Sequence, residues 1–425
     1  MKKIIALITL FATSTHTENL TVSGAQSIKM PLRIITLDKT NQELNTVAQI
    51  IKKDLNFTNQ FTTTTQALSA PTPPKKLQTT IKKLCTNGTP IALCLSASEN
   101  NSIEWRLYDT MNITMIAGKT YKKKGTVLRG WAHAIADKVL NALTGNDGFF
   151  SSRITYCQES RKNDKTVRQI FVADFDGSHK ELLIETPSIV MAPRWNVDLK
   201  NPTIFFSHYT DTNVQLVSVD MHKNKKIASN LDGITMLPGF SPDGSTIMYS
   251  ASNGNGNCQL YHHTPTSIRC FTRNDGNNIS PIFLDNDRIC FCSDAQTKSP
   301  QLYIGNIHTG HVQRITNGGY CTSPSYCKKT NTIAYHKKIN NYMQIMEYDC
   351  ATKTHTQITA STTNKHETTQ SPCGTYLLFR QEYNNTSKLT MLNRITRTSQ
   401  DITKPSEQCS HPHWSACYAH FPIVT

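Results

Sequence analysis

Two short runs of histidine are the residues of this chain best suited to bind a metal ion or to exchange protons near neutral pH. They are His262-His263 and His411-Pro412-His413. A zinc site needs further ligands at a fixed spacing, and no cysteine or carboxylate stands where it would complete either run. We therefore expect surface or turn histidines at both places, and the sequence predicts no metal and no other cofactor.

Three aspartates are the next candidates for chemistry. Asp174, Asp220 and Asp349 each follow a short strand pattern. Aspartate at such a position stabilises a hairpin turn, and a calcium site is the alternative. The sequence contains no G-x-S-x-G motif, and no hydrolase domain follows the repeats described below. The chain is therefore predicted not to be an enzyme.

His133 is the one histidine that falls inside a strong helix pattern. The pattern covers about 127–144, and its apolar side includes Trp131, Ile135 and Val139. A histidine in this position can serve a function directly or can be hydrogen-bonded where two domains meet. We adopt the second interpretation and assign His133 to a domain interface.

The elements that must position these residues repeat about every 44 residues in the second part of the chain. Each unit opens with a short strand that usually carries proline, followed two residues later by a large side chain. The six openings are PRW at 193, PGF at 238, PIF at 281, PSY at 324, TTQ at 368 and PHW at 412. Proline fits the first position of a strand, where its missing N–H removes no ladder hydrogen bond.

Each opening belongs to a unit of four short strands, which is the signature of a propeller blade. The third-strand pattern occurs six times, so we predict six blades. The array begins with a second-type strand at 153 and ends with a first-type strand at 412. The segment 411–415 should therefore supply the inner strand of the first blade and remove the exposed edges of the ring.

Residues 31–145 have a different pattern, in which helices and strands alternate. Strands are expected at 32–37, 90–96, 103–107 and 112–119, and helices from Asn41, over 77–84 and over 127–144 with a cap at Gly145; Thr62 to Pro74 is expected to be a loop. The predicted fold is an α/β N-terminal domain over 18–147 followed by an all-β six-bladed β-propeller over 148–425.

The first residues, MKKIIALITLFATSTHT, place two lysines before an apolar run of nine residues. Nine residues are too few to span a bilayer as a helix, which needs about 20. The pattern is typical of a secretory signal peptide, approximately residues 1–17. The mature protein is expected to be soluble and exported.

The overall charge is +15, which suits acidic partners. The basic residues are dispersed and form no aromatic–basic ladder, so we expect a solvated surface and no nucleic-acid partner. The chain has 13 cysteines, an odd number, with no C-x-x-C motif. Cys85 and Cys94 are the most plausible local disulfide pair.

The junction LRGWAHAIADKVLNALTGNDGFFSSRITY and the turn FSPDG at 240–244 resemble the TolB family, the periplasmic propeller proteins of the Tol–Pal system. The matching residues in the junction are Leu128, Arg129, His133, Asp137, Leu143, Thr144, Gly145, Gly148, Phe150, Arg153, Ile154 and Tyr156. The resemblance covers nearly the whole chain. It implies a non-enzymatic periplasmic protein that binds the peptidoglycan-associated lipoprotein Pal and supports outer-membrane integrity and cell division.

Two features depart from the family pattern. Only one blade keeps the S-P-D-G turn intact. The resemblance also implies docking of the segment around 18–27 on TolA, one of the inner-membrane Tol proteins. Here that segment reads ENLTVSGAQS, which is polar and differs from the family pattern, so TolA docking is not carried over.

The residues just before each inner strand should lie at one mouth of the central channel. They are mixed polar and apolar without strong charge, which suits a protein or peptide better than phosphate. Because the resemblance implies a Pal-like lipoprotein, we predict that it binds here; the alternative is that these residues only cap the channel. The predicted contact residues are Met191, Thr235, Met236, Ile279, Ser280, Thr322, Ser323, Glu367, Thr368, Ser410 and His411.

Two other function classes remain open from the sequence. One is a propeller enzyme or lyase that acts on acidic glycans, with the positive charge steering its substrate. A convergent cluster of His, Asp and Glu in the channel would favour it, and none is expected from the spacing. The other is an extracellular adhesion propeller.

Overall fold

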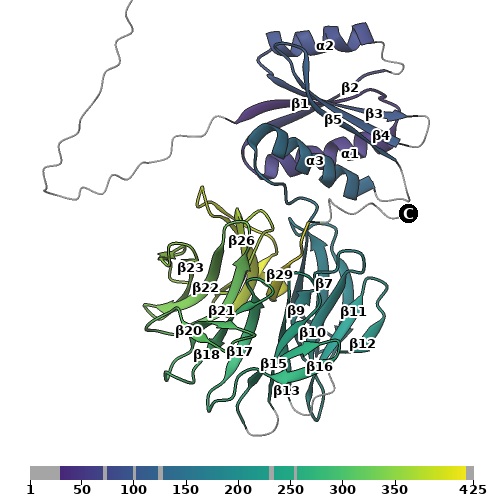
Figure 1. Ribbon diagram of the computed structural model, residues 1–425. Helices are drawn as coiled ribbons and strands as arrows, with labels where there is room; N and C mark the ends of the chain where they lie inside the picture. Colours follow the sequence, from purple (N-terminus) through teal and green to yellow (C-terminus); the bar gives the residue numbers. More distant parts are fainter. Residues whose placement is uncertain are drawn as a thin grey trace, which may run out of the picture.

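The structure is a computed structural model that describes residues 29–69, 74–98, 102–122, 128–228, 234–252 and 256–417. A small α/β layer stands on one pole of a ring of β-sheets (Figure 1). The predicted signal peptide, 1–17, and the segment 18–27 lie outside the described residues. No helix in the described ranges has both the length and the apolar character needed to cross a membrane.

The α/β domain is a five-stranded sheet with helices on both faces. Its elements are β1 (Met30–Thr36), α1 (Gln42–Phe57), β2 (Phe61–Ala67), α2 (Pro74–Thr86), β3 (Ile91–Ser98), β4 (Ser102–Asp109), β5 (Thr114–Lys122) and α3 (Leu128–Thr144). The strand order is β2-β1-β3-β4-β5, with β1 parallel to both neighbours and β3, β4 and β5 antiparallel. Helices α1 and α3 face the propeller, and α2 covers the distal face (Figure 1).

The helix ends follow local chemistry. Asn41 precedes α1, and its Oδ1 accepts a hydrogen bond from the Leu44 N–H at 3.0 Å, which satisfies one of the free donors of the first turn. After α3, Gly145 has φ +72° and its N–H donates to the Asn141 carbonyl at 2.8 Å. Glycine adopts this left-handed cap without steric cost. Both helix ends agree with the sequence prediction.

The loop expected over Thr62 to Pro74 is wrong in its first half. Residues Phe61–Ala67 form β2, which pairs with β1 in parallel from Met30 opposite Phe61 to Thr36 opposite Ala67. Threonine is β-branched and fits a pleated strand, and this preference outweighs the polarity of FTTTTQA. The prolines that suggested a loop all come after the strand, and Pro74 is the first residue of α2.

The second part of the chain is the predicted six-bladed β-propeller. Each blade is given from its innermost strand outward: the first has β29 (Cys409–Trp414), β6 (Arg153–Lys162), β7 (Lys165–Asp174) and β8 (Glu181–Thr186), and the second has β9 (Val190–Trp195), β10 (Thr203–Tyr209), β11 (Val214–Asp220) and β12 (Lys225–Ile227). The third blade has β13 (Ile234–Phe240), β14 (Ile247–Ser252), β15 (Gln259–Thr264) and β16 (Ser267–Cys270), and the fourth has β17 (Asn278–Phe283), β18 (Arg288–Ser293), β19 (Gln301–Asn306) and β20 (Val312–Arg314). The fifth blade has β21 (Cys321–Cys327), β22 (Thr332–Ile339), β23 (Tyr342–Asp349) and β24 (His355–Gln357), and the sixth has β25 (Asn364–Gln370), β26 (Tyr376–Tyr383), β27 (Thr386–Asn393) and β28 (Ser399–Asp401). A short 3-10 helix, Pro405–Glu407, precedes β29.

The ring closes as the sequence predicted. Strand β29 pairs with β6, and Trp414 stands opposite Ile154. The Trp414 side chain is 5% exposed, and its Nε1–H donates to the Ser152 hydroxyl at 2.6 Å. The last strand of the propeller therefore completes the first blade, and no end of the ring presents an open inner edge.

The prolines of the repeat do not stand at the first position of the inner strands. Pro193, for example, is the fourth residue of β9. Each inner strand has a register shift at this point, where two of its residues face one on the partner strand. The residue just before the proline, or before Thr368 in the one blade without it, has positive φ in all six blades: Ala192, Leu237, Ser280, Ser323, Glu367 and His411. The repeated proline therefore marks a β-bulge, where a ladder N–H is not needed.

All thirteen cysteines lie within the described residues, and all are free thiols. This includes Cys85 and Cys94, the local pair considered above. Most of the thiols are buried in strands, where cysteine behaves as a small apolar side chain.

Candidate functional site

The predicted contact residues lie at the pole of the propeller that faces away from the α/β domain. Inner strand β29 ends at Trp414, and the Trp414 ring packs against Phe149, which in turn contacts Phe57 of α1. The ends of the inner strands therefore lie near the α/β domain, and their starts lie at the opposite pole (Figure 1). We call this opposite pole the open mouth.

The eleven predicted residues stand inside the inner strands, at the bulge or ahead of it, and not before the strands as expected. The reason is the bulge, which continues each strand for several residues ahead of the proline. Thr368 is buried, the side chain of Thr235 is not described, and the other nine residues are half-buried. The strand starts therefore expose side chains at the open mouth while their backbones are held in the ladders.

One side of the open mouth is apolar and rich in sulfur. The Tyr209 hydroxyl lies 3.4 Å from the Met191 sulfur and 3.5 Å from the Met236 sulfur. Ile279 follows on the next blade and packs against the core below it. Methionine side chains are flexible and polarisable, so they adapt to the surface of a partner. This side of the mouth suits an apolar side chain of a protein.

The other side of the open mouth holds a connected group of charged and imidazole side chains. Glu367 accepts a hydrogen bond from the His411 backbone N–H at 2.5 Å, and its other oxygen lies 3.2 Å from the His411 ring. Arg380 lies 3.7 Å from Glu367 and 3.5 Å from Glu382. His366 completes the chain at 3.4 Å from Glu382. We call these five residues the mouth charge cluster.

Burial and neighbouring charges shift the pKa values of this cluster. Burial by itself would raise the pKa of Glu367, but the nearby His411 and Arg380 outweigh it and lower that pKa. Burial lowers the pKa of both His366 and His411. Near neutral pH Glu367 is therefore a carboxylate, and His366 and His411 are neutral imidazoles.

The sequence expectation that no such cluster would form is therefore wrong. Glu367 and His411 come from inner strands, but Arg380 and Glu382 come from the end of β26. Second strands run antiparallel to inner strands, so their ends meet the inner-strand starts at the same pole. The last residues of the second-strand motifs could have indicated these mouth residues: YLLFRQE at 376 ends with Arg380 and Glu382, and TIFFSHY at 203 ends with Tyr209.

At the opposite pole, His133 lies between the two domains. Its Nδ1 is 2.7 Å from the Asp54 carboxylate on α1, and its Nε2 is 3.4 Å from the Asp174 carboxylate at the end of β7. Arg129, one turn earlier on α3, also binds Asp174 through its Nε. Lys53 forms a further ion pair with Asp176 at 2.7 Å. We call these residues the interdomain ion network.

The protonation of His133 follows from its two carboxylate neighbours. Burial alone would lower its pKa, but the hydrogen bonds and charges of Asp174 and Asp54 outweigh burial and raise the pKa to about 9. Asp174 is held below its ordinary pKa because the same histidine and Arg129 overcome its burial. His133 is therefore a buried cation at neutral pH that joins the two domains.

Comparison with known proteins identifies the family. A family model described as the TolB beta propeller domain matches residues 140–418. The chain belongs to the TolB family. Proteins named Tol-Pal system protein TolB from Rickettsia bellii and Rickettsia africae are each 30% identical over 154 residues, which is 36% of this chain and 34% of theirs. The matched segment thus spans about a third of the length of these relatives.

Solved structures agree on the fold. TolB from Acinetobacter baumannii superposes with a TM-score of 0.75 at 20% identity, covering 91% of this chain and 97% of that protein. Hydrazine synthase from Kuenenia stuttgartiensis matches with a TM-score of 0.51 at 13% identity, over 63% of this chain and 47% of that protein. Proteins with different functions share the propeller, so this likeness concerns fold alone.

The remaining candidates of this TolB family member have structural roles. Asp220 accepts hydrogen bonds from the His222 and Asn224 N–H groups, and Asp349 does the same in its own turn, as predicted. Asp174 was expected to stabilise a turn in the same way, but its side chain joins the interdomain ion network instead.

Both histidine runs lie in strands, β15 and β29, and not in turns; His262 is buried, and His411 belongs to the mouth charge cluster. The Nδ1 of the His413 ring accepts a hydrogen bond from the backbone N–H of Trp195 at 3.1 Å, and burial lowers the pKa of His413 well below the ordinary value. His262 is buried on β15, where Arg269 donates to its ring at 3.3 Å. Within the described part of the chain, no three His, Cys, Asp or Glu side chains converge as metal ligands.

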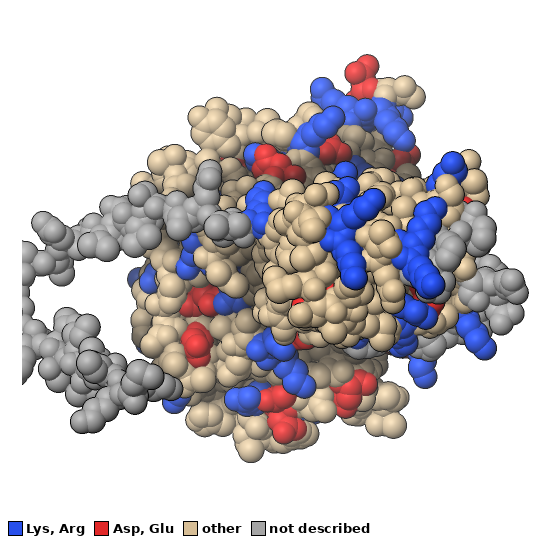
Figure 2. All heavy atoms as spheres, turned by 90° about the horizontal axis from the view of Figure 1, so that it is seen from above, with Lys and Arg blue, Asp and Glu red and all other residues tan. Residues whose placement is uncertain are grey.

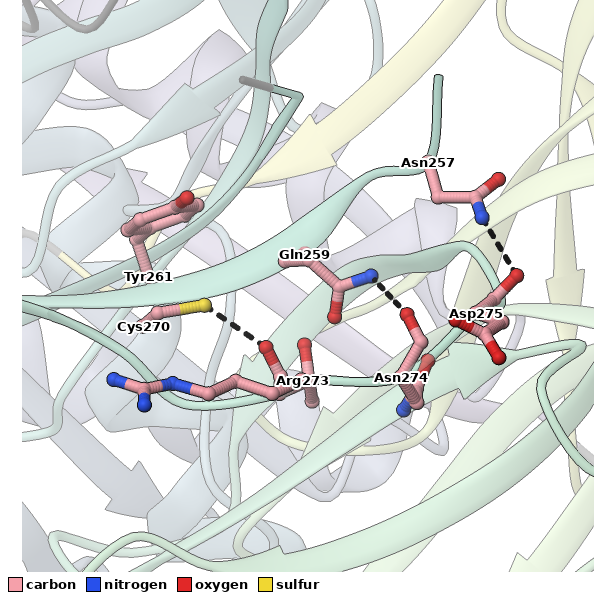
Figure 3. A pocket seen from close by; sticks show the side chains of 8 residues that line it. Asn257, Gln259, Tyr261, Cys270, Arg273, Asn274 and Asp275 are labelled. Carbon is pink, nitrogen blue, oxygen red and sulfur yellow. Dashed lines mark hydrogen bonds between the residues drawn. The ribbon is translucent and has the colours of Figure 1, made fainter. Parts of the chain in front are cut away.

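A polar cavity of roughly 470 Å³ lies on the outside of the third blade (Figure 3). Its amide groups already have partners: Asn257 donates to the Asp275 carbonyl at 2.6 Å, and Gln259 donates to the carbonyls of Asn274 and Gly276. The amides of Asn257 and Gln259 therefore tie the start of β15 to the loop that leads to the next blade (Figure 3). Their role in this TolB family member is to hold that loop.

Proposed function

We propose that this chain is a periplasmic, non-enzymatic component of the Tol–Pal system. Its open mouth binds a peptidoglycan-associated lipoprotein, and the protein links that lipoprotein to an inner-membrane Tol complex. This link supports outer-membrane integrity and cell division. Membership of the TolB family supports the assignment to the Tol–Pal system, because the relatives carry the name of a Tol-Pal system protein.

The single observation that carries the binding proposal is the asymmetry of the open mouth. Half-buried Met191, Tyr209 and Met236 form an adaptable apolar side, and the mouth charge cluster stands across from them. Protein interfaces combine an apolar centre with polar groups that fix orientation. A lipoprotein domain that presents one apolar side chain next to charged groups would match both sides.

Substitution at the apolar side tests this proposal. Met236→Asp together with Ile279→Asp should reduce capture of purified Pal-like lipoprotein by at least about 100-fold, because a buried charge at an interface costs more than 2 kcal/mol. The matched control is Ile227→Asp with Ile268→Asp, two exposed residues on outer strands β12 and β16. Thermal unfolding of each variant reports whether the ring is intact. Equal capture by both variants, with both folded, would refute the binding site.

We further propose that binding at the open mouth and binding at the N-terminal segment, 18–27, affect each other through the interdomain ion network. Both ligand sites would then bias the same contact between α3, α1 and the β7 end, as coupling between sites requires. His133→Gln should change lipoprotein affinity without touching the open mouth. Calorimetric titration of wild type and variant measures this coupling, and identical affinities would contradict it.

The mouth charge cluster favours a second candidate, a lyase acting on acidic glycans. Neutral His411 beside Glu367 could accept a proton, while Arg380 could bind a uronate carboxylate. Such an enzyme forms an unsaturated sugar, whose absorbance can be followed with oligogalacturonate as substrate. A signal lost in Glu367→Gln would support this candidate over the binding proposal, and no signal at any metal or pH condition would remove it.

A further inference from the structure

The positive charge of this protein is concentrated in the α/β domain. Residues 29–145 contain sixteen Lys and Arg against seven Asp and Glu, whereas the 280 residues from 146 onward contain 27 against 22. Seen along the axis from the α/β side, basic side chains gather over the face that looks away from the propeller (Figure 2). The charge that the sequence pattern suggested was dispersed is therefore concentrated at one end of the molecule.

Helix α2 supplies the centre of this face. It has four basic residues, all exposed, which form two pairs about two helical turns apart: Lys75 with Lys76, and Lys82 with Lys83. The helix has no acidic residue. Across the described ranges, no carboxylate forms an ion pair with these four lysines, whereas propeller lysines such as Lys162 and Lys388 do have such partners. Four like charges are thus displayed together without compensation.

Exposed apolar side chains stand beside the basic helix. Met111 is 74% exposed, Met115 58% and Ile116 42%, all at or after the turn between β4 and β5. This turn is next to the end of α2, because Ile113 packs in the same small core as Leu84. The lysines of α2 and these three apolar residues form one surface, which we call the distal face.

The turn that presents these apolar residues is fixed. Ile113 has φ +54°, a left-handed conformation that is unusual for a β-branched residue. Asp109 accepts a hydrogen bond from the Met111 N–H at 2.8 Å, and Thr110 donates from its N–H to the Pro90 carbonyl at 2.9 Å. These contacts hold Met111 outside the core.

We propose that the distal face docks on a membrane surface that contains anionic phospholipids. Lysines would bind the headgroups, and Met111, Met115 and Ile116 would enter the boundary with the acyl chains. The choice of lysine supports lipid over an acidic protein, because protein interfaces favour arginine and aromatic side chains and are poor in lysine. A second copy of this chain is disfavoured, because two such faces would repel each other. Docking here leaves the open mouth free, directed away from the membrane.

Sedimentation with lipid vesicles tests this proposal on the full chain. The protein should bind vesicles of two parts phosphatidylcholine to one part phosphatidylglycerol, and not vesicles of phosphatidylcholine alone. Raising NaCl from about 0.05 to about 0.5 M should release most of it, since exposed charges are then screened. No binding to the anionic vesicles, or equal binding to both kinds, would overturn the proposal.

Charge-matched variants locate the surface. Changing Lys75, Lys76, Lys82 and Lys83 to Gln should lower the partition coefficient by at least about 100-fold, at roughly fivefold for each lysine near an anionic surface. Changing the exposed propeller lysines Lys200, Lys223, Lys225 and Lys226 to Gln removes the same charge and should have little effect. Glutamine is a good helix former, so α2 should stay intact, which circular dichroism verifies. An equal loss in both variants would assign binding to net charge and refute the distal face.

The apolar contribution is tested separately. Met111→Ser with Met115→Ser should weaken binding to the anionic vesicles about tenfold and make the remainder fully salt-sensitive, because only the electrostatic attraction is left. Both residues are exposed, so thermal stability should not change. Unchanged partitioning would show that these side chains do not enter the membrane and would overturn that part of the proposal. Lipoprotein capture by the open mouth serves as an independent readout and should be normal in every distal-face variant.

Discussion

The two poles of the propeller are built from the same strands and carry opposite kinds of contact. At the covered pole, Phe149 and Phe175 pack against Phe57 of the α/β domain, with ring centroids 6.2 and 5.0 Å from the Phe57 ring, and the interdomain ion network surrounds them. At the open mouth, the described side chains are mostly half-buried and the inner strands are bulged. The covered pole is closely packed against the α/β domain, whereas the open mouth keeps the partly exposed side chains that the proposed lipoprotein binding requires.

The difference follows from chain direction. Every inner strand starts at the open mouth and ends at the covered pole. The large side chain that stands two residues after the proline position of each repeat, such as Trp195 or Trp414, therefore lies between the bulge and the covered pole. The same repeat thus gives each strand a packed end and a strained end. Substitutions at the two ends should therefore differ in size and in sign.

Removing the closing strand should have the largest effect. Deleting residues 411–425 removes Trp414 and most of the partner strand of β6, and should cost more than about 5 kcal/mol, because a buried Trp alone contributes 3–5 kcal/mol. The whole ring should melt earlier, not only the first blade. Thermal unfolding followed by circular dichroism measures this. Deleting only 418–425 keeps β29 and is the control; similar melting of wild type and the longer deletion would contradict closure as a source of stability.

The aromatic contact at the covered pole should come next. Phe175 is fully buried, and its ring meets those of Phe57, Phe149, Phe150 and His133. Phe175→Ala should destabilise the protein by about 3–5 kcal/mol through lost burial and the cavity left behind. Because the Phe175 ring touches both domains, the two domains should still unfold together, but at a lower denaturant concentration. Phe175→Leu, which keeps most of the volume, should cost less than half as much.

The interdomain ion network should give a pH-dependent effect of about 3 kcal/mol. His133 has a pKa of about 9 when folded and about 6.5 when unfolded, so its contribution is complete below pH 6.5 and is lost as pH rises to 9. Its carboxylate neighbour Asp54 has a pKa raised by burial to about 6, so it titrates below this window. Denaturant unfolding between pH 6.5 and 9 should show falling stability in the wild type.

His133→Gln is the matched variant, since glutamine can still hydrogen-bond but carries no charge. Its stability should change little between pH 6.5 and 9, and it should be lower than that of the wild type at pH 6.5. Parallel curves for the two proteins would show that His133 is not the titrating group.

The sequence predicted most of the covered pole and only part of the open mouth, for a physical reason. Buried strands and helices follow hydrophobic periodicity, and counting the strands predicted that the segment 411–415 completes the first blade, where the structure places Trp414 opposite Ile154. The mouth charge cluster depends on side chains that converge from β25, β26 and β29, which no local spacing reveals. His133 was placed at the interface by its helix and the family pattern, but its partners Asp54 and Asp174 lie 79 and 41 residues away along the chain.

The bulged end of the inner strands offers the smallest effect and the opposite sign. Ser323 has φ +53° in β21, and its half-buried side chain stands just before Pro324. A non-glycine residue in this region is strained, and glycine is not. Ser323→Gly should therefore stabilise the protein by about 0.5–1 kcal/mol, as measured by denaturant unfolding.

The neighbouring residue in the same strand provides the control for this sign. Ser325 is also half-buried in β21, has no positive φ and pairs with Ala334 on β22. Ser325→Gly should destabilise the protein by about 0.5–1 kcal/mol, because glycine loses more backbone freedom in an ordinary strand position. Opposite signs at two residues so close together would locate the backbone strain in the bulge itself. A loss of stability in both variants would mean that the six positive-φ residues are unstrained and that the bulges at the open mouth store no strain.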